Sequence, residues 1–381
     1  MTTSIGKREL DDAGRKLLER ATQSRENFED LVIVPIFAVI VALVLGALIL
    51  LLTGVDIATI GKSFAALAKG SVGSINAVSE TLTAAIPLVL AGLGLGLGFR
   101  AGLFNIGAEG QLLMGGMAAV VFAFSFPGLP FPVLMLLALV AGALVGAVYA
   151  GIAGLLKATT GAHEVISTIM LNLTSYQILI YLLRQPYIQK EGRSDPISKS
   201  VPPNGQLPQL LDWIDPNMRL HAGFFLMLIA VAFVWWLLFR SKIGFAFRAS
   251  GANPDAARYA GMKSGFVIVA AMATAGALAG LAGAAQVQGV LERASPGFSA
   301  GIGFDAIALA LLGRSHPVGI LFAGILFGGL EAGGRQMQVD AGVSIDLIGI
   351  IQALIIVFIA APLLVRAIFP WGFARPSKGG K

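Results

Sequence analysis

The segment FNIGAEGQ, from Phe104 to Gln111, places polar side chains among glycines inside an otherwise apolar stretch. Asn105, Glu109 and Gln111 carry hydrogen-bonding groups that are costly at membrane depth unless they serve a purpose. The glycines loosen the backbone, so we expect a broken helix whose freed backbone groups face a cavity. We predict that these three side chains contact a solute; a purely structural role is the alternative.

A polar stripe follows in HEVISTIMLN, which begins at His163. Glu164, Thr168 and Asn172 are spaced four residues apart and therefore share one face of a predicted helix. Such a stripe either lines a pathway or binds a neighbouring helix, and Glu164 has the further alternative of capping its helix. We assign all three residues to a pathway.

Two later positions are candidates for the same pathway. Gln286 and Gln288 lie on opposite sides of one predicted helix, so only one of them can face a pathway, and Gln286 is the one we assign. Asp305 follows the glycine-rich run FSAGIGF and is as readily a helix cap as a ligand group.

A different kind of element is predicted in RASGANPDAARYAGMKSG, from Arg248 to Gly265. Asn253 followed by Pro254 is a typical helix opening, and Gly261 ends the short helix. A helix of about two turns is marginal alone, because nucleation is costly. We therefore expect it to dock against a partner; the alternative is that it only caps the bundle.

Catalytic and nucleotide-binding chemistry is not indicated. The chain has no cysteine, its three histidines are scattered, and no GxSxG motif occurs. GLGLGLG, from Gly92 to Gly98, lacks the strand, turn and helix of a dinucleotide site. Gly61, Lys62 and Ser63 resemble the end of a P-loop, but Asp56 stands where that motif opens with glycine. The sequence thus predicts neither an enzyme nor a metal site.

The elements that must position these residues are membrane helices. Hydrophobic residues make up 56% of the chain and charged residues 13%, and the mean hydropathy is +0.82. We predict an all-α polytopic bundle of about ten membrane segments, at 31–52, 81–99, 109–126, 133–156, 164–183, 221–239, 266–290, 303–313, 317–331 and 345–365. The segments 303–313 and 317–331 are too short to cross a core of about 30 Å singly, so we expect them to be broken or re-entrant.

Glycine and alanine recur at four-residue spacing inside the predicted helices, which favours close packing of helix backbones. The three stripes comprise Gly142, Gly146, Ala150 and Gly154; Gly276, Gly280 and Ala284; and Gly324, Gly328 and Ala332.

Charge predicts the orientation. With both termini in the cytoplasm, the inner side carries 18 of the 27 Lys and Arg residues. Because these charges lie between apolar segments, the net charge of +6 does not indicate nucleic-acid binding. We divide the chain into a cytoplasmic tail (1–30), a transmembrane domain (31–366) and a second cytoplasmic tail (367–381). Within the domain, 184–220 is an extracytoplasmic loop, either a docking surface or a connector, and 240–264 is a cytoplasmic loop.

Four motifs together carry a family resemblance. They are FNIGAEGQLLMGG at Phe104 to Gly116, HEVISTIMLN at His163 to Asn172, GANPDAARYAG at Gly251 to Gly261, and SPGFSAGIGFDAIALALLGRSHPVG at Ser295 to Gly319. In this order they resemble permease subunits of bacterial ABC importers, in the nucleoside and simple-sugar branch of the ribose and branched-chain amino-acid permease superfamily. The resemblance covers residues from about 80 to 365.

The resemblance implies partners and a site. It implies a multi-pass protein of the bacterial inner membrane, in contact with lipid. Its implied partners are a second permease, an extracytoplasmic solute-binding protein and an ATP-binding subunit whose two cassettes hold ATP and Mg. The chain itself would then hold no cofactor. The loop 240–264 would couple to the ATPase through Gly251, Asn253, Asp255, Arg258, Tyr259 and Gly261.

The implied mechanism is ATP-driven alternating access, which carries a nucleoside or simple sugar between two permeases. Hydroxyl groups of such solutes suit Asn, Gln and Glu side chains, and Phe104 could stack on a base. The rival interpretation is an ion-coupled secondary transporter in which Glu109, Glu164 or Asp305 is protonated.

Overall fold

A computed structural model describes residues 34–344 and 346–360. The described part is helical, and its only β-type pairings are two isolated bridges, Gln189 with Ser198 and Gln209 with His221. The predicted tails 1–30 and 367–381 lie outside the described residues. The α-helices are α2 (Val34–Leu52), α3 (Ile57–Val72), α4 (Ile75–Arg100), α5 (Ala108–Ser125), α6 (Val133–Thr160), α7 (Glu164–Leu183), α8 (Gly223–Arg240), α9 (Lys242–Ala252), α10 (Pro254–Tyr259), α11 (Ser264–Gln286), α12 (Ile302–Leu312), α13 (Pro317–Ala341) and α14 (Asp346–Ala360). Two shorter elements are the 3₁₀ turn η2 (Pro203–Gly205) and the π-helix η3 (Val287–Leu291), which continues α11.

The all-α class is confirmed, and seven of the described helices are long and apolar enough to cross a membrane. The segment predicted at 317–331 is wrong in its end, because α13 continues without a break to Ala341. α12 is short, as predicted. α3 was missed, because its two lysines, Lys62 and Lys69, lower its average hydropathy.

The chain divides into two compact units. The smaller unit comprises residues up to Gly61 and from Ser344 onward, and in it α2 packs against α14 through Ala38, Val41 and Phe358. The larger unit comprises residues 62–343 and includes the four motifs described in the sequence analysis.

The core of the larger unit forms around α11, which packs against α4, α5 and α6. Glycine makes this closeness possible: a Cβ atom at Gly280 would collide with the backbone of Gly142, and one at Gly146 with the backbone of Gly276. A Cβ atom at Gly328 of α13 would likewise collide with the backbone of Thr81 in α4. The predicted role of the small-residue stripes in packing is confirmed.

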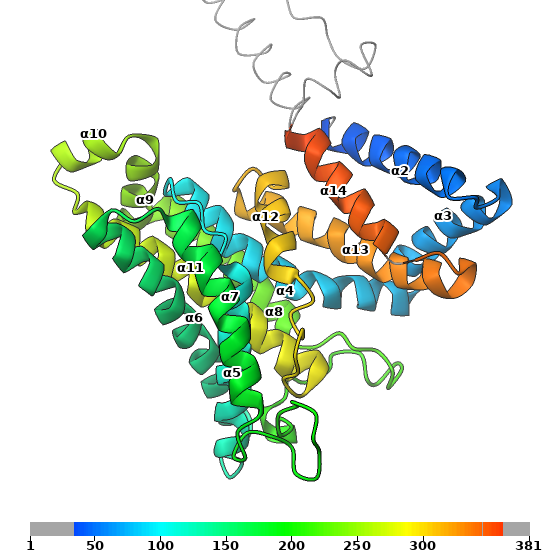
Figure 1. Cartoon of the computed structure of the whole chain (residues 1–381), viewed down its shortest axis with the longest axis horizontal. Helices are drawn as coiled ribbons and strands as arrows, with labels where there is room; N and C mark the ends of the chain where they lie inside the picture. Colours follow the sequence, from blue (N-terminus) through cyan, green and yellow to red (C-terminus); the bar gives the residue numbers. More distant parts are fainter. Residues whose placement is uncertain (1–33, 345, 361–381) are drawn as a thin grey trace, which may run out of the picture. The chain divides into compact units, whose positions relative to one another are not determined.

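The larger unit has two opposite ends (Figure 1). One end carries α9 and α10, and we name it the α10 end. The other carries the loop 184–222 between α7 and α8, and we name it the long-loop end. This loop is folded onto the helices: Asn204 Nδ2 donates to the carbonyls of Pro127 and Leu129, and the amide of Ser198 donates to the carbonyl of Ala294.

Candidate functional site

The predicted break lies between α4 and α5. Gly102 adopts a φ of +72°, and the chain resumes its helix only at Ala108. The freed backbone groups are bound by α7: the amide of Ile106 donates to Thr168 Oγ1 (3.2 Å), the amide of Gly110 donates to Asn172 Oδ1 (2.9 Å), and Asn172 Nδ2 donates to the carbonyl of Ile106 (2.7 Å). The polar stripe of α7 therefore faces the break.

Asn105 and Gln111 bind each other inside this break. Asn105 Nδ2 donates to Gln111 Oε1 (3.1 Å), and Gln111 Nε2 donates to Asn105 Oδ1 (3.0 Å), which also accepts from the amide of Gly107 (2.8 Å). Each side chain is 1% exposed. Their amide groups thus fix the shape of the broken segment, and contact with a solute stays a prediction.

Glu164 begins α7 and lies at the same break. Its Oε2 accepts from Lys157 Nζ (2.5 Å), and its Oε1 accepts from the amide of Phe104 at 3.4 Å. The ring of Phe104 stacks on that of Phe99 with centroids 4.9 Å apart, and the residue is 42% exposed. Glu164 thereby connects α6, α7 and the break.

Glu109 connects the break to α12. Its carboxylate accepts from Ser299 Oγ and from the amide of Gly303 (2.8 Å), one of the free amides in the first turn of α12. Asp305, in the same turn, interacts electrostatically with Glu109 and with Glu331 of α13. α12 packs against both α5 and α13, the helices that carry Glu109 and Glu331.

A charged group that sequence reasoning missed lies beside them. Arg219, from the long loop, binds Glu80 of α4 in two hydrogen bonds, the longer of 2.9 Å from Nε. Arg335 of α13 pairs with Glu331 (3.3 Å) and with Glu80 (3.5 Å). We name Glu80, Arg219, Glu331 and Arg335 the charged network. The spacing of Glu331 and Arg335, one helical turn apart, could have indicated this pair. It was overlooked because the predicted segment 317–331 ended before Arg335.

The charged network borders two cavities. A small cavity of about 50 Å³ brings together α4, η3, α12 and α13, and Gln286 lies in its wall; it is lined by Thr83, Ala84, Pro87, Arg219, Gln286, Val290, Ile302, Glu331 and Arg335. A second cavity of about 320 Å³ shares Arg219, Arg335 and Glu80 with the network. Gln288 does not share the small cavity but lines another, at the long-loop end. The two glutamines thus face different cavities, and the assignment of Gln286 to the pathway stays a prediction.

The short helix predicted at the α10 end is confirmed as α10. Asn253 Oδ1 accepts from the amide of Ala256 (3.0 Å), and Gly261, with a φ of +83°, closes the helix. Asp255 and Arg258 are exposed, and Tyr259 is 94% exposed. Gly251 packs closely against the break, because a Cβ atom there would collide with the backbone of Arg100 to Gly102, and its role in coupling stays a prediction.

The structure thus separates the predicted residues into three places. Phe104, Asn105, Gln111, Glu164, Thr168 and Asn172 gather at the break; Glu109, Gln286 and Asp305 lie toward the small cavity and the charged network; the residues of α10 stand alone at one end. α10 lies at the α10 end of the larger unit (Figure 1), whereas Gly251, in the preceding helix α9, lies against Gly102 at the break.

The comparisons with known proteins agree with one another. Residues 77–360 match the family described as branched-chain amino acid transport system / permease component. The guanosine ABC transporter permease protein NupP of Bacillus subtilis is 38% identical over 88% of this chain and 94% of its own length. The nucleoside ABC transporter permease protein NupB of Lactococcus lactis is 34% identical over 89% and 93%. The glucose ABC transporter permease protein TsgB13 of Haloferax volcanii is 35% identical over 85% and 86%.

In each of these three organisms a second permease protein also matches, at 27% or 29% identity. No solved structure shows a significant match. These relatives are components of ABC transporters, which work with an ATPase, so ion-coupled transport is not favoured. The broken helix, the polar cavities between membrane helices and these matches lead to one assignment. The chain belongs to this family of permease components and is a multi-pass membrane subunit of an ABC importer, a transport component and not an enzyme.

Proposed function

We propose that this permease carries a nucleoside or a simple sugar into the cytoplasm. The observation that supports the solute class most is the identity of 34% to 38%, over about nine-tenths of the chain, to permeases named for guanosine, nucleosides and glucose. The lining of the small cavity suits such solutes in its chemistry, because Thr83, Gln286 and Glu331 offer donors and acceptors for hydroxyl groups, and the cavity of about 50 Å³ has to widen to admit them.

The proposed orientation places both termini in the cytoplasm of a bacterial cell, across its inner membrane. The α10 end then lies in the cytoplasm, and the long-loop end lies outside. Solute passes near the bilayer midplane between two permeases, past Phe104, Asn105, Glu109, Gln111, Glu164, Thr168, Asn172, Gln286 and Asp305. The charged network lies toward the outer side of this path, where it holds Arg219 of the long loop against α4 and α13.

The proposed partners are an ATP-binding subunit with two cassettes, a second permease and an extracytoplasmic solute-binding protein. ATP and Mg belong to the ATP-binding subunit, which supplies the hydrolysis. The second permease is a different chain in this proposal, because each of three organisms has two permeases that match this one unequally.

Coupling to ATP hydrolysis is proposed to run through α10. Asn253, Asp255, Arg258 and Tyr259 project from it as contacts for the ATPase, while Gly261 shapes its end. Gly251 lies against Gly102, so a displacement of α10 and α9 reaches the break between α4 and α5 directly. The break in turn holds Glu109 and the start of α12, which gives alternating access a continuous mechanical route.

The test is uptake by the assembled transporter in proteoliposomes. We expect ATP-dependent uptake of guanosine, uridine, ribose or glucose and none of leucine. Uptake of leucine alone would overturn the solute class. In the same preparation, Arg258→Ala combined with Tyr259→Ala is expected to abolish uptake while ATP hydrolysis continues. Tyr181→Ala serves as the matched control, because Tyr181 is a tyrosine of α7 that is 66% exposed and belongs to neither proposed contact surface.

A further inference from the structure

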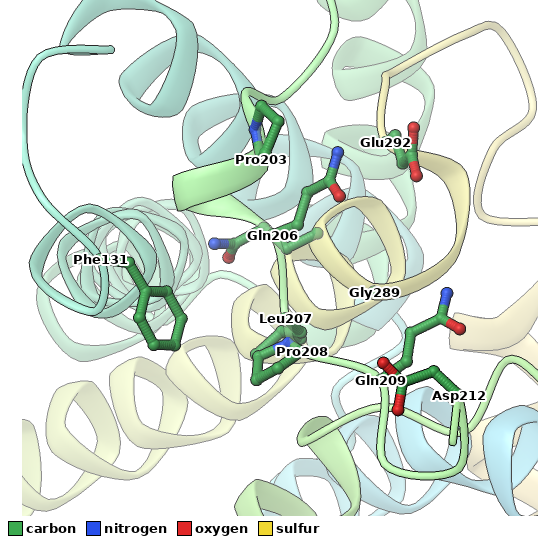
Figure 2. Close-up of a pocket in the computed structure, with 10 residues that line it drawn as sticks. Phe131, Pro203, Gln206, Leu207, Pro208, Gln209, Asp212, Gly289 and Glu292 are labelled. Carbon is green, nitrogen blue, oxygen red and sulfur yellow. The ribbon is translucent and has the colours of Figure 1, made fainter. Parts of the chain in front are cut away.

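A cavity of about 270 Å³ lies at the long-loop end, and none of its lining residues belongs to the small cavity or to the charged network. Figure 2 shows this cavity in close-up. It is formed by the loop around residues 203–212, by the turn before α6 and by η3. Its lining consists of Phe131, Pro203, Gln206, Leu207, Pro208, Gln209, Asp212, Gln288, Gly289 and Glu292.

Gln288 lines this cavity with a side chain whose position is fixed by hydrogen bonds. It is 1% exposed, and its Nε2 donates to the carbonyls of Gly205 (2.7 Å) and Met135 (3.2 Å), which fixes the orientation of the amide. Its Oε1 is buried and has no hydrogen-bond partner among the residues that the structure describes. A buried acceptor without a donor costs about 1 to 3 kcal/mol. The oxygen is closed to solvent, so an occupant that brings a donor is stabilised by it only where the surrounding lining shifts to open it.

The charge of the lining favours a cation. Asp212 and Glu292 contribute two carboxylates, and the described residues that line the cavity include no Lys or Arg. Glu292 has a φ of +58°, a left-handed backbone that is unusual for a residue other than glycine, and its carbonyl is held by the amide of Val201 (2.7 Å). Strained backbone of this kind gathers at functional positions. Both residues are exposed, so water solvates their carboxylates, and a cationic group gains an attraction to them that a neutral solute lacks.

The shape of the cavity favours a long side chain over a compact ion. Figure 2 shows Phe131 on one side of the cavity, near Leu207 and Pro208, and the carboxylates of Glu292 and Asp212 on the other. Phe131 is 52% exposed, so its ring is open to an occupant. The apolar stem of an arginine suits the wall of Phe131 and Pro208, and its five planar donors suit acceptors that lie in several directions. Arginine is also a common anchor in pockets of protein interfaces.

We propose that this cavity receives an arginine side chain of the extracytoplasmic subunit that delivers solute to the permease. This proposal rests on the proposed function, which places the long-loop end outside the cell. It assigns the cavity to a protein contact, whereas the solute itself binds deeper, near the charged network.

The test uses the assembled transporter in proteoliposomes, with uptake measured against the concentration of the solute-binding subunit. Asp212→Asn combined with Glu292→Gln keeps the shape of both side chains and removes their charge. We expect the half-saturating concentration of the solute-binding subunit to rise about ten-fold, which corresponds to about 1.4 kcal/mol, with the maximal rate unchanged. Glu191→Gln is the control: its carboxylate belongs to the same loop, is 90% exposed and lies outside the lining, so no change is expected.

A second measurement identifies the contact. The chain has no cysteine, so Gln209→Cys creates a single site for a short photo-activated cross-linker. We expect the cross-linked peptide of the solute-binding subunit to contain an exposed arginine, whose change to glutamate weakens delivery as the double variant does. A peptide without arginine, or a half-saturating concentration that stays within two-fold of the wild type, overturns the proposal.

One further outcome assigns the cavity differently. If the double variant changes the dependence on free solute at saturating solute-binding subunit, the cavity is a solute subsite and the proposal is wrong. Failure of the proposed function is distinguishable, because the wild-type transporter would then show no uptake of nucleoside or sugar at any concentration of solute-binding subunit.

Discussion

The larger unit contains two clusters of polar residues among its membrane helices, the break and the charged network. They differ in exposure and in whether they border a cavity. At the break, Asn105 and Gln111 satisfy each other and are 1% exposed. In the charged network, the side chains are 19% to 44% exposed and border two cavities. Polar groups that satisfy each other fix the shape of the chain, whereas polar groups beside open space keep capacity for a ligand. We propose that the break supports the solute path and that the network offers the better place for a solute to bind.

The sharpest way to break this comparison is Asn105→Ala. The substitution leaves both polar groups of Gln111 and the amide of Gly107 without the partners that Asn105 supplies. At about 1 to 3 kcal/mol for each buried unsatisfied group, we expect a loss of about 3 kcal/mol or more in the free energy of unfolding. Thermal unfolding in detergent measures it, with the exposed Asn76→Ala as control.

Asn105→Ala combined with Gln111→Ala sharpens the same point. The double variant removes the orphaned side chain, so its loss of stability is expected to be smaller than the sum of the two single losses. Additive losses would contradict the mutual pairing.

The pH dependence of stability extends the comparison to His221, a buried ionisable residue at the long-loop end. His221 is 1% exposed, its Nδ1 accepts from the amide of Gly223 (3.2 Å), and burial lowers its pKa from 6.5 to about 4. Between pH 6.5 and pH 4, His221 is therefore protonated in the unfolded chain and neutral in the folded chain. The stability contributed by neutral His221 is complete above pH 6.5 and is lost as the pH falls toward 4, by about 2 kcal/mol at pH 5.

The pH dependence is measured by thermal unfolding at pH 8 and pH 5. His221→Asn offers an acceptor that does not titrate, so the difference between the two pH values should shrink by about 2 kcal/mol. An equal difference in both proteins would exclude His221 as its source.

The smallest expected change in stability is that of Glu331→Gln. The side chain is 43% exposed and pairs with Arg335 in the same helix, a pairing worth less than about 1 kcal/mol. Solute uptake is nevertheless expected to weaken at least ten-fold, because Glu331 lines the small cavity. Unchanged uptake, or a loss of stability as large as that of Asn105→Ala, would reverse the roles that we give to the two polar groups.

Local chemistry explains what the sequence could predict. α7 begins at Glu164 and ends at Leu183, as predicted, because an acidic first turn precedes a stretch that is apolar on most positions and contains no Pro or Gly. α10 was predicted because its cap, its proline and its closing glycine are adjacent in sequence. The amphipathic stripe of α7 was also identified, although its hydrogen bonds to the break were not, since they join residues about sixty positions apart.

Long-range pairing explains what the sequence could not predict. The end of α13 was placed too early, because Glu331 and Arg335 are costly in a membrane helix unless their partners are known. Those partners come from α4 and from the long loop. α9 was also missed, although Ser241, whose Oγ accepts from the amide of Gly244 (2.9 Å), was a readable cap signal.

The π-helix at the end of α11 gives one short segment a place in two compartments. Gln286 lies in the wall of the small cavity and Gln288 in that of the cavity at the long-loop end, only two residues further along the chain. A twist of this segment about its own axis swings the two amides in opposite directions. Docking of the solute-binding subunit at the outer cavity would then change the orientation of Gln286 in the small cavity, because both glutamines belong to the same turn of backbone.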